Sequence, residues 1–412
     1  MTAFAEPVRI ERIASGGDGV GRLPDGRTVF VPRSAPGDLL TLRDVQLHKR
    51  FARARIADVV EHAPERVVPP CPHYVRDSCG GCQLQHLAVP AQEAAKRAIA
   101  GDALRRLGRF DSADPDLESA PAEWHYRARI TLHRDERAER IGFHRLGAPG
   151  TIFELETCLI ADERLVARWR VLRRHRSLLP AAFDGLTLRI ERAGGRHVLL
   201  RAKGEHAWTT GRELALRIRA DGQPATVWWQ PERGAARVVG GADELFPASV
   251  FEQVNPAMGD QLRVHALDRL GEVAGRHVWD LYAGIGEATA ALAQRGAMVE
   301  SVEWDKHAVQ VAVARGPDGP RRLATRVEDA LDRLKPPELV LTNPPRAGME
   351  PRVVDAIAAH RPARIVYISC DPATLARDLA RLGNAYRLVH ARAFDLFPQT
   401  AHVETVAVME RA

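Results

Sequence analysis

The sequence predicts a multidomain chain with an N-terminal β-barrel, a central α+β region and a C-terminal doubly wound α/β domain. Five short alternating runs broken by glycine fill residues 4–61, a pattern typical of a small closed barrel of the oligonucleotide-binding type. From about residue 246 the order strand, loop, helix repeats, which indicates a parallel sheet covered by helices. We therefore expect three domains, over residues 1–61, 62–245 and 246–412.

The composition argues against a membrane protein and permits nucleic acid as a partner. Of 412 residues, 45% are apolar and 27% charged, as in soluble globular proteins. No run approaches the roughly 18–20 apolar residues of a membrane span, and the N-terminus has no signal pattern, so we expect a cytoplasmic monomer. Lys and Arg (59) exceed Asp and Glu (53), and most of this positive charge is Arg, which suits phosphate contact and base stacking.

The barrel begins with the run Val8–Ile13, and Asp25-Gly26 marks a hairpin before the strand Thr28–Val31. Further strand-like runs cover 39–47 and 51–61. The basic residues of this region give the barrel either a solvated face or, as we favour, a face that contacts single-stranded nucleic acid. They include Arg9, Arg12, Arg22, Arg27, Arg33, Lys49, Arg50, Arg53 and Arg55.

The central region predicts one clear helix and little chemistry. Apolar residues at helical spacing cover 91–107 and stop before glycine, and strands are expected near 127–132 and 186–192. We expect Trp228 and Trp229 in the core, whereas Phe251 is a candidate for stacking on a nucleic-acid base.

Five strands and four helices are expected to alternate in the C-terminal domain, with ligands bound at the carboxyl ends of the strands. The expected strands are 277–281, 298–303, 338–342, 364–369 and 403–410, and the expected helices are 288–295, 308–314, 351–359 and 373–382.

The segment Asp280-Leu-Tyr-Ala-Gly-Ile-Gly286 puts an acid at a strand end, before a glycine turn into a helix. Glycines let the backbone approach a ligand closely, and a helix N-terminus binds polar groups. A dinucleotide fingerprint needs a third glycine that is absent. The segment therefore looks like a binding loop for S-adenosylmethionine, and the alternative is an ordinary turn with solvated acids. Its candidate residues are Asp280, Tyr282, Gly284 and Gly286.

Three later strand ends are candidates for the same site. Glu303 ends the next strand, where it would accept hydrogen bonds from ribose hydroxyls. Asp329 is placed by its spacing to meet the adenine edge. Asn343 opens Asn343-Pro-Pro-Arg346, and the two prolines fix the backbone that places its side chain beside the reacting group.

Cys370 and Glu404 together indicate covalent catalysis. Cys370 follows the apolar run 364–368, Glu404 comes thirty-four residues later, and each is expected at the end of a late strand. A thiolate adds to an electron-poor ring, and a carboxylate later removes a proton from it. Taken singly, such a cysteine is usually a packing residue and such a glutamate is usually solvated.

Four motifs carry a resemblance to a known family. They are Asp-Leu-Tyr-x-Gly-x-Gly, Pro-Pro-Arg-x-Gly, Ser-Cys-x-Pro-x-Thr-Leu-Ala-Arg-Asp and His-Val-Glu, in this order. The chain resembles the RNA uridine-5-methyltransferases, in particular the ribosomal RNA enzymes with an N-terminal TRAM domain. The resemblance spans nearly all of the chain and is weakest in its centre. It implies an RNA-binding TRAM barrel, a central iron–sulfur domain and a Rossmann-like methyltransferase domain.

The resemblance implies a role for each matching residue. Cys370 would add to carbon 6 of uracil, carbon 5 would take the methyl group of S-adenosylmethionine, and Glu404 would remove the proton from carbon 5. Gln253 resembles the family's glutamine that contacts the methyl donor. The chain departs from the family at Asn343, where an acid is usual, and at Asp371, where Asn is usual. An Asn amide pairs with uracil and, when flipped, with cytosine, so base choice is less firmly specified than the nucleophile.

The remaining cysteines suggest a metal site. Cys71, Cys79 and Cys82 are close in sequence, and Cys158 follows after a long gap. This sparse, odd-numbered set argues against a disulfide framework. The resemblance implies a [4Fe-4S] cluster on the four thiolates. Structural zinc is the alternative, although zinc ribbons usually show two Cys-x₂-Cys pairs and this chain has one.

The expected function is therefore methylation of carbon 5 of a uridine in RNA, foremost in 23S ribosomal RNA. A transfer RNA enzyme is an alternative. A radical methylthiotransferase also joins a TRAM barrel to a cluster, but it needs a Cys-x₃-Cys-x₂-Cys motif that is absent. A non-catalytic RNA-binding assembly factor is a third alternative, and the presence of both Cys370 and Glu404 speaks against it.

Overall fold

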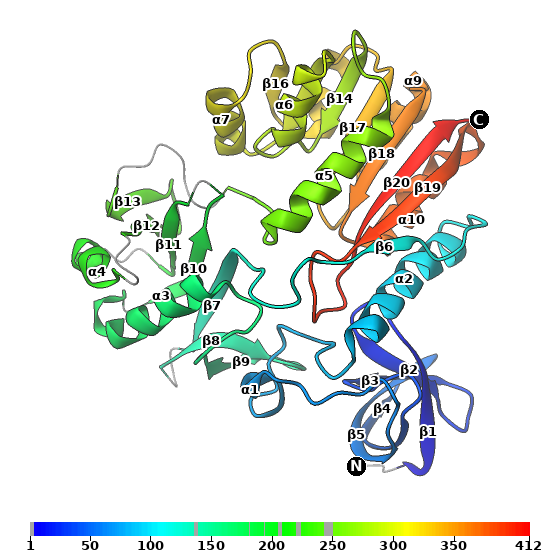
Figure 1. The fold of residues 1–412 in the computed structure, drawn as a ribbon, viewed down its shortest axis with the longest axis vertical. Helices are drawn as coiled ribbons and strands as arrows, with labels where there is room; N and C mark the ends of the chain where they lie inside the picture. Colours follow the sequence, from blue (N-terminus) through cyan, green and yellow to red (C-terminus); the bar gives the residue numbers. More distant parts are fainter. Residues whose placement is uncertain are drawn as a thin grey trace.

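The protein is built on three β-sheets (Figure 1). The computed structural model describes residues 4–135, 139–180, 182–192, 194–204, 208–219, 224–242 and 250–412. A five-stranded barrel holds the N-terminal part, a seven-stranded sheet the central part and an eight-stranded sheet the C-terminal part. The predicted barrel and the predicted α/β fold are thus confirmed.

The N-terminal sheet closes into a barrel because β1 pairs with both β2 and β4. The strand order is β1-β2-β3-β5-β4. Side chains alternate between the interior and solvent, as in a curved sheet with one buried face, and Val29 and Val31 of β3 are fully buried. The strands are β1 (Phe4–Ile13), β2 (Asp18–Arg22), β3 (Thr28–Pro32), β4 (Leu39–Leu47) and β5 (Phe51–Glu61).

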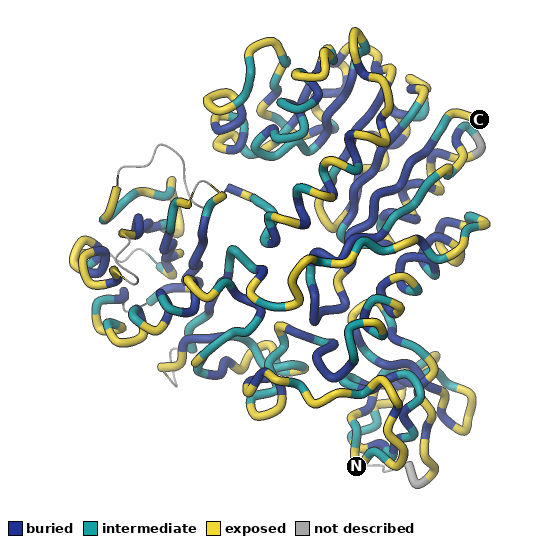
Figure 2. The backbone as a smooth tube through the Cα atoms, viewed as in Figure 1, coloured by how far each residue is buried: buried dark blue, intermediate teal, exposed yellow. Residues whose placement is uncertain are grey.

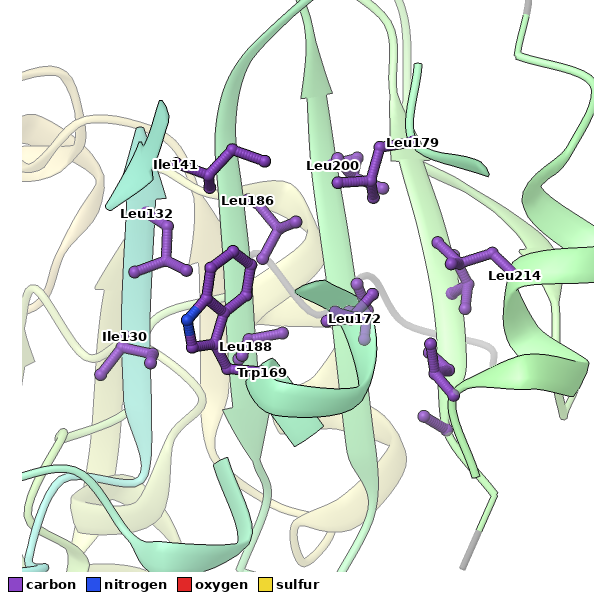
Figure 3. Close-up of a cluster of buried hydrophobic side chains, with 14 of the residues drawn as sticks. Ile130, Leu132, Ile141, Trp169, Leu172, Leu179, Leu186, Leu188, Leu200 and Leu214 are labelled. Carbon is purple, nitrogen blue, oxygen red and sulfur yellow. The ribbon is translucent and has the colours of Figure 1, made fainter. Parts of the chain in front are cut away.

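The central sheet has the order β13-β12-β11-β10-β7-β8-β9. Trp169 of α3 lies in one buried cluster with Leu186 and Leu188 of β10 (Figure 3). Trp228 and Trp229 are buried, as predicted. The elements from residue 62 onward are α1 (Pro72–Val75), α2 (Val89–Arg106), β6 (Asp116–Glu118), β7 (Arg129–Asp135), β8 (Arg140–Arg145), β9 (Ala148–Glu154), α3 (Glu163–Arg174), β10 (Phe183–Ile190), β11 (Arg196–Ala202), α4 (Gly211–Arg217), β12 (Thr226–Gln230) and β13 (Arg237–Gly240).

The C-terminal sheet has the order β16-β15-β14-β17-β18-β20-β19-β6. Its core strands are buried on both faces, because helices cover the sheet (Figure 2). Its elements are α5 (Pro256–Leu270), β14 (His277–Leu281), α6 (Glu287–Gln294), β15 (Met298–Glu303), α7 (Lys306–Arg315), β16 (Arg321–Ala324), α8 (Val327–Ala330), β17 (Leu339–Thr342), α9 (Pro351–His360), β18 (Arg364–Ser369), α10 (Pro372–Arg381), β19 (Tyr386–Phe394) and β20 (Glu404–Arg411).

Two expectations about this sheet were wrong. It is not wholly parallel, because β20 runs antiparallel to both β18 and β19. Glu404 therefore lies at the start of its strand and not at the end. Because β20 is reversed, its start lies at the same edge of the sheet as the end of β18. Strand β6, from the predicted central domain, pairs with β19, and the division at residue 245 stays a prediction.

The segment that carries three of the cysteines is anchored to the barrel. Arg33, from the end of β3, donates hydrogen bonds to the carbonyls of Tyr74 and Cys79, and its guanidinium lies 4.0 Å from the centre of the Tyr74 ring. This basic residue therefore fixes the cysteine segment and is not free to contact nucleic acid.

Candidate active site

The strand register brings the thiol and the carboxylate together. Cys370 directly follows β18, and Glu404 opens β20. Ser369 pairs with Thr405 in the antiparallel ladder, so the next step of the register sets Cys370 opposite Glu404. Cys370 is half-buried, whereas only 4% of Glu404 is exposed.

Burial and neighbouring charges set the protonation of the pair. Burial raises the pKa of the Cys370 thiol, and the Glu404 carboxylate raises it further. Burial also raises the pKa of Glu404, to about 7. The Arg346 guanidinium acts in the opposite direction on both groups, and it hydrogen-bonds to the Cys370 side chain. Glu404 consequently changes charge near neutral pH.

Sequence reasoning did not give Arg346 a role, although the Pro-Pro-Arg motif that contains it was recognised. Its loop, between β17 and α9, is fixed from α10: the Thr374 hydroxyl donates to the Arg346 carbonyl at 3.0 Å, and Arg377 donates to the Ala347 carbonyl at 2.8 Å. The guanidinium is therefore presented to Cys370 from a backbone held on the neighbouring helix.

The departure at Asp371 has a structural explanation. Asp371 is the N-cap of α10, and its Oδ1 accepts from the Thr374 backbone N–H at 2.9 Å. Asn and Asp are about equally good N-caps, so the helix that follows Cys370 tolerates either.

Asn343, the other departure, is half-buried, and its backbone N–H donates to the Leu281 carbonyl at 3.2 Å, between the ends of β17 and β14.

The glycine loop after β14 is tied to the next strand end. The Gly284 N–H donates to Glu303 Oε2 at 3.0 Å, and the Asp305 N–H donates to Glu303 Oε1 at 2.8 Å. Tyr282, Gly284 and Gly286 have positive φ angles of 61°, 55° and 76°, which bend the chain tightly into α6. Glu303 therefore shapes the loop as well as being available to a ligand.

Asp280 is buried beneath this loop. The Thr289 hydroxyl of α6 donates to Asp280 Oδ2 at 2.5 Å. Burial raises the pKa of Asp280 to about 6, although the bonds from Thr289 lower it. The carboxyl group thus fastens the start of α6 to the end of β14, a role that sequence reasoning did not assign to it.

The other candidates are less closely gathered. Gln253 is half-buried and packs beside Gly259 of α5, Asp329 is exposed in α8, and 59% of Phe251 is exposed. A cavity of about 260 Å³ borders Gly286 and the start of α6. Its lining includes Gly286 of the glycine loop but not Asp280, Glu303 or Cys370.

The four remaining cysteines line one cavity of about 400 Å³, together with His73 and Tyr74. All four are free thiols: Cys71, Cys79, Cys82 and Cys158. Burial raises the pKa of three of them, that of Cys79 to about 12. Within the described ranges, no three His, Cys, Asp or Glu side chains lie close enough together to hold a single metal ion. The predicted iron–sulfur cluster is therefore not confirmed.

Comparison with known proteins identifies the family to which this fold belongs. The family model for tRNA (Uracil-5-)-methyltransferase matches residues 321–412, and that for the TRAM domain matches residues 6–57. The chain is 32% identical to the 23S rRNA (uracil(1939)-C(5))-methyltransferase of Chromohalobacter salexigens, over 99% of this chain and 90% of the relative. It is 34% identical to an uncharacterized RNA methyltransferase of Nitratidesulfovibrio vulgaris, over 98% and 95%.

A solved structure shares the whole fold. The tRNA (uracil-54, C5)-methyltransferase of Pyrococcus abyssi, in complex with S-adenosyl-L-homocysteine, aligns with a TM-score of 0.71 at 23% identity, over 98% of this chain and all of that one. Fold and comparisons together define a class I S-adenosylmethionine-dependent methyltransferase. The chain belongs to the RNA uracil-5-methyltransferase family, as its motifs predicted. Along the described residues, every helix is too short or too polar to cross a lipid bilayer.

Proposed function

We propose that the protein methylates carbon 5 of a uridine in 23S ribosomal RNA, in the cytoplasm. The observation that carries the proposal is the register of β18 and β20, which sets Cys370 opposite Glu404 with Arg346 acting on both. Relatives named as 23S rRNA uracil methyltransferases match over nearly the full length of this chain, and they support this choice of substrate.

Cys370 is the nucleophile in the proposed mechanism. Its thiolate adds to carbon 6 of a uracil that has been flipped out of its stack. A carbon–sulfur bond forms, and the electrons of the carbon 5–carbon 6 double bond move onto the ring, so that carbon 5 becomes nucleophilic. Arg346 favours the reactive thiolate, because its positive charge lowers the thiol pKa that burial raises.

Carbon 5 then takes a methyl group, which S-adenosylmethionine supplies as an activated sulfonium. The glycine loop, with Glu303 and the half-buried Gln253, is the proposed binding region for this donor. Asp280 and Thr289 hold the loop in place.

Glu404 completes the reaction as the base. Its carboxylate takes the proton from carbon 5, the electrons of that bond restore the double bond to carbon 6, and the thiolate of Cys370 leaves. A pKa of about 7 makes Glu404 a stronger base than an ordinary glutamate while about half of it is still ionised at neutral pH. The freed Cys370 is then ready for another turnover.

Asn343 is the proposed reader of the base. It lies between the end of β14, which precedes the glycine loop, and the end of β18, which precedes Cys370. Its amide donates to oxygen 4 and accepts from nitrogen 3 of uracil in the arrangement we propose.

The barrel is the proposed RNA-binding surface. Several of its basic residues are paired with acids, such as Arg9 with Glu61 and Arg27 with Asp25. A group on the β4–β5 hairpin is instead exposed and clustered, which suits contact with a phosphate backbone. It comprises Lys49, Arg50, Arg53 and Arg55.

We also propose that Cys71, Cys79, Cys82 and Cys158 hold the [4Fe-4S] cluster. A single zinc ion needs its thiolates about 2.3 Å from one point, whereas a four-iron cluster is larger and holds its ligands farther apart. Four thiols, two of them buried and two half-buried, around a cavity of about 400 Å³ suit the larger group better. Anaerobically purified protein is then brown with iron and sulfide in equal amounts, and Cys158→Ser loses this colour. Colourless protein with stoichiometric zinc would contradict the cluster.

Methylation of defined RNAs tests the function. Purified protein is incubated with S-adenosylmethionine and either a 23S ribosomal RNA transcript or transfer RNA transcripts, and digested nucleosides are analysed by mass spectrometry. We expect 5-methyluridine in the ribosomal RNA, and none with Cys370→Ala. Methylation of transfer RNA alone would show that the substrate is wrong, and 5-methylcytidine would show that Asn343 reads the other base.

A further inference from the structure

The loop of residues 395–403 joins β19 to β20 and leads directly into Glu404. Loops between strands usually run over the surface, but this one is buried (Figure 2). Within the described part of the chain, no hydrogen bond holds the Glu404 carboxylate, so the path of the backbone fixes where that group lies. The buried members of the loop are Asp395, Leu396, Pro398, Gln399, Thr400, Ala401 and Val403.

Two side chains of α2, about 300 residues away in sequence, hold this loop through hydrogen bonds. The Lys96 ammonium, which is fully buried, donates to Asp395 Oδ1 at 2.5 Å and to the Phe397 carbonyl at 3.1 Å. Gln92, one helical turn earlier, donates to Gln399 Oε1 and accepts from the Gln399 N–H, both at 3.0 Å. We call Lys96 and Gln92 the loop clamp.

A buried lysine calls for an explanation, because an ammonium away from water is unfavourable unless it is paired in good geometry. An apolar side chain of similar length would fill the same volume of α2 with no such penalty. The ion pair fixes direction as well as distance, because Lys96 donates to both a carboxylate and a carbonyl. Compared with an apolar side chain, the ion pair therefore adds a defined path for the loop.

The clamp acts close to the catalytic base. Asp395 follows Phe394, and Phe394 is the residue that pairs with Glu404 in the β19–β20 ladder. Gln399 has a φ of 69°, which is uncommon for a residue other than glycine, so its conformation needs support from its surroundings. That support includes the Leu84 N–H, which donates to the Gln399 carbonyl at 3.0 Å.

On the basis of the function proposed above, we propose that Lys96 and Gln92 are positioning residues that hold Glu404 where it can take the proton from carbon 5. Neither residue touches the substrate. Loss of the clamp leaves addition of Cys370 and methyl transfer in place but slows proton removal. The methylated base then stays bonded to the Cys370 sulfur, because the thiolate leaves only when that proton is removed.

The experiment measures covalent protein–RNA complex with natural, unfluorinated RNA and S-adenosylmethionine. We expect Lys96→Met and Gln92→Met to accumulate the complex and to lower kcat about 10- to 100-fold, the size of effect that a small misplacement of a catalytic group produces. The KM for RNA should fall together with kcat, so that kcat/KM stays within about twofold of wild type, because the slowed step comes after methyl transfer. Both variants still form the adduct with 5-fluorouridine RNA, which requires no proton removal.

The matched control is Arg364→Met. Arg364 pairs with Glu410 at 2.5 Å, on the same two strands but at the end far from Cys370 and Glu404. This variant loses an ion pair between β18 and β20 and should accumulate no complex. If Lys96→Met does not fold because Asp395 is left unpaired, the double variant Lys96→Met/Asp395→Asn and the uncharged change Gln92→Met give the answer.

Clamp variants that release RNA as quickly as wild type would overturn the positioning role. Equal accumulation by Arg364→Met would also overturn it, because any weakening of the two strands would then suffice. Wild-type protein that neither methylates RNA nor forms the fluorinated adduct would instead refute the proposed function.

Discussion

The ionisation of Glu404 gives the most direct physical prediction. Burial raises its pKa from 4.5 to about 7. A base must be deprotonated to act, so release of the methylated RNA from Cys370 should quicken as the pH rises through 7. With this pKa about a tenth of Glu404 is ionised at pH 6, and release should be about tenfold slower there than at pH 8 or above. An ordinary glutamate would give no change over this range.

The same shift predicts an effect on stability. The raised pKa means that the folded state favours the protonated acid, so stability is full below about pH 4.5 and falls as the pH rises through 7. The loss amounts to about 3 kcal/mol at pH 8. Glu404→Gln resembles the protonated acid, so it should be more stable than wild type at pH 8 by up to this amount and equally stable at pH 4.5.

Two assays check these values. Covalent complex is allowed to accumulate at pH 5.5, the pH is jumped to values between 6 and 8, and the decay of the complex is followed on denaturing gels. Urea denaturation at pH 4.5 and 8 compares wild type with Glu404→Gln. A flat rate of decay, or a Gln variant that releases RNA at the wild-type rate, would refute the reasoning.

Three other predictions follow from the site. Arg346→Met removes the charge that lowers the pKa of both Cys370 and Glu404, so the pH–rate profile should move to higher pH, with Arg346→Lys between it and wild type. Thr289→Val removes the hydroxyl that donates a hydrogen bond to buried Asp280, so it should lower the free energy of unfolding by about 1–3 kcal/mol. Thr289→Ser keeps a hydroxyl and should not lower it. Gly286→Ala places a Cβ 2.8 Å from the Ala312 Cβ, while Gly284→Ala meets nothing within 4 Å. Gly286→Ala should therefore be less stable than Gly284→Ala by about 1–3 kcal/mol, measured by urea denaturation.

The strands that place the site could largely be predicted from sequence. The expected runs at 277–281, 298–303 and 364–369 coincide with β14, β15 and β18, because buried strands that end in a polar functional residue have clear limits. Strand β16 was missed, since Arg321–Ala324 has only four residues, two of them arginines, and lies at the sheet edge.

Direction and long-range pairing could not be predicted in the same way. Apolar periodicity shows that β20 is a strand but not which way it runs in the sheet, so the antiparallel pairing that sets Glu404 beside Cys370 was not predicted. The partner of Lys96 lies 299 residues away, and no local pattern reveals such a pair. Arg346 stood in a recognised motif, but only the fold shows that it reaches both Cys370 and Glu404.

The central claim is that the Cys370 sulfur bonds transiently to a uracil ring. Wild-type protein is mixed with 5-fluorouridine-substituted 23S ribosomal RNA and S-adenosylmethionine, digested, and analysed by mass spectrometry for a peptide that carries a methylated fluorouridine. The account predicts this mass on the peptide that contains Cys370, and none with Cys370→Ser. An adduct on another residue, or normal methylation of natural RNA by Cys370→Ser, would contradict it.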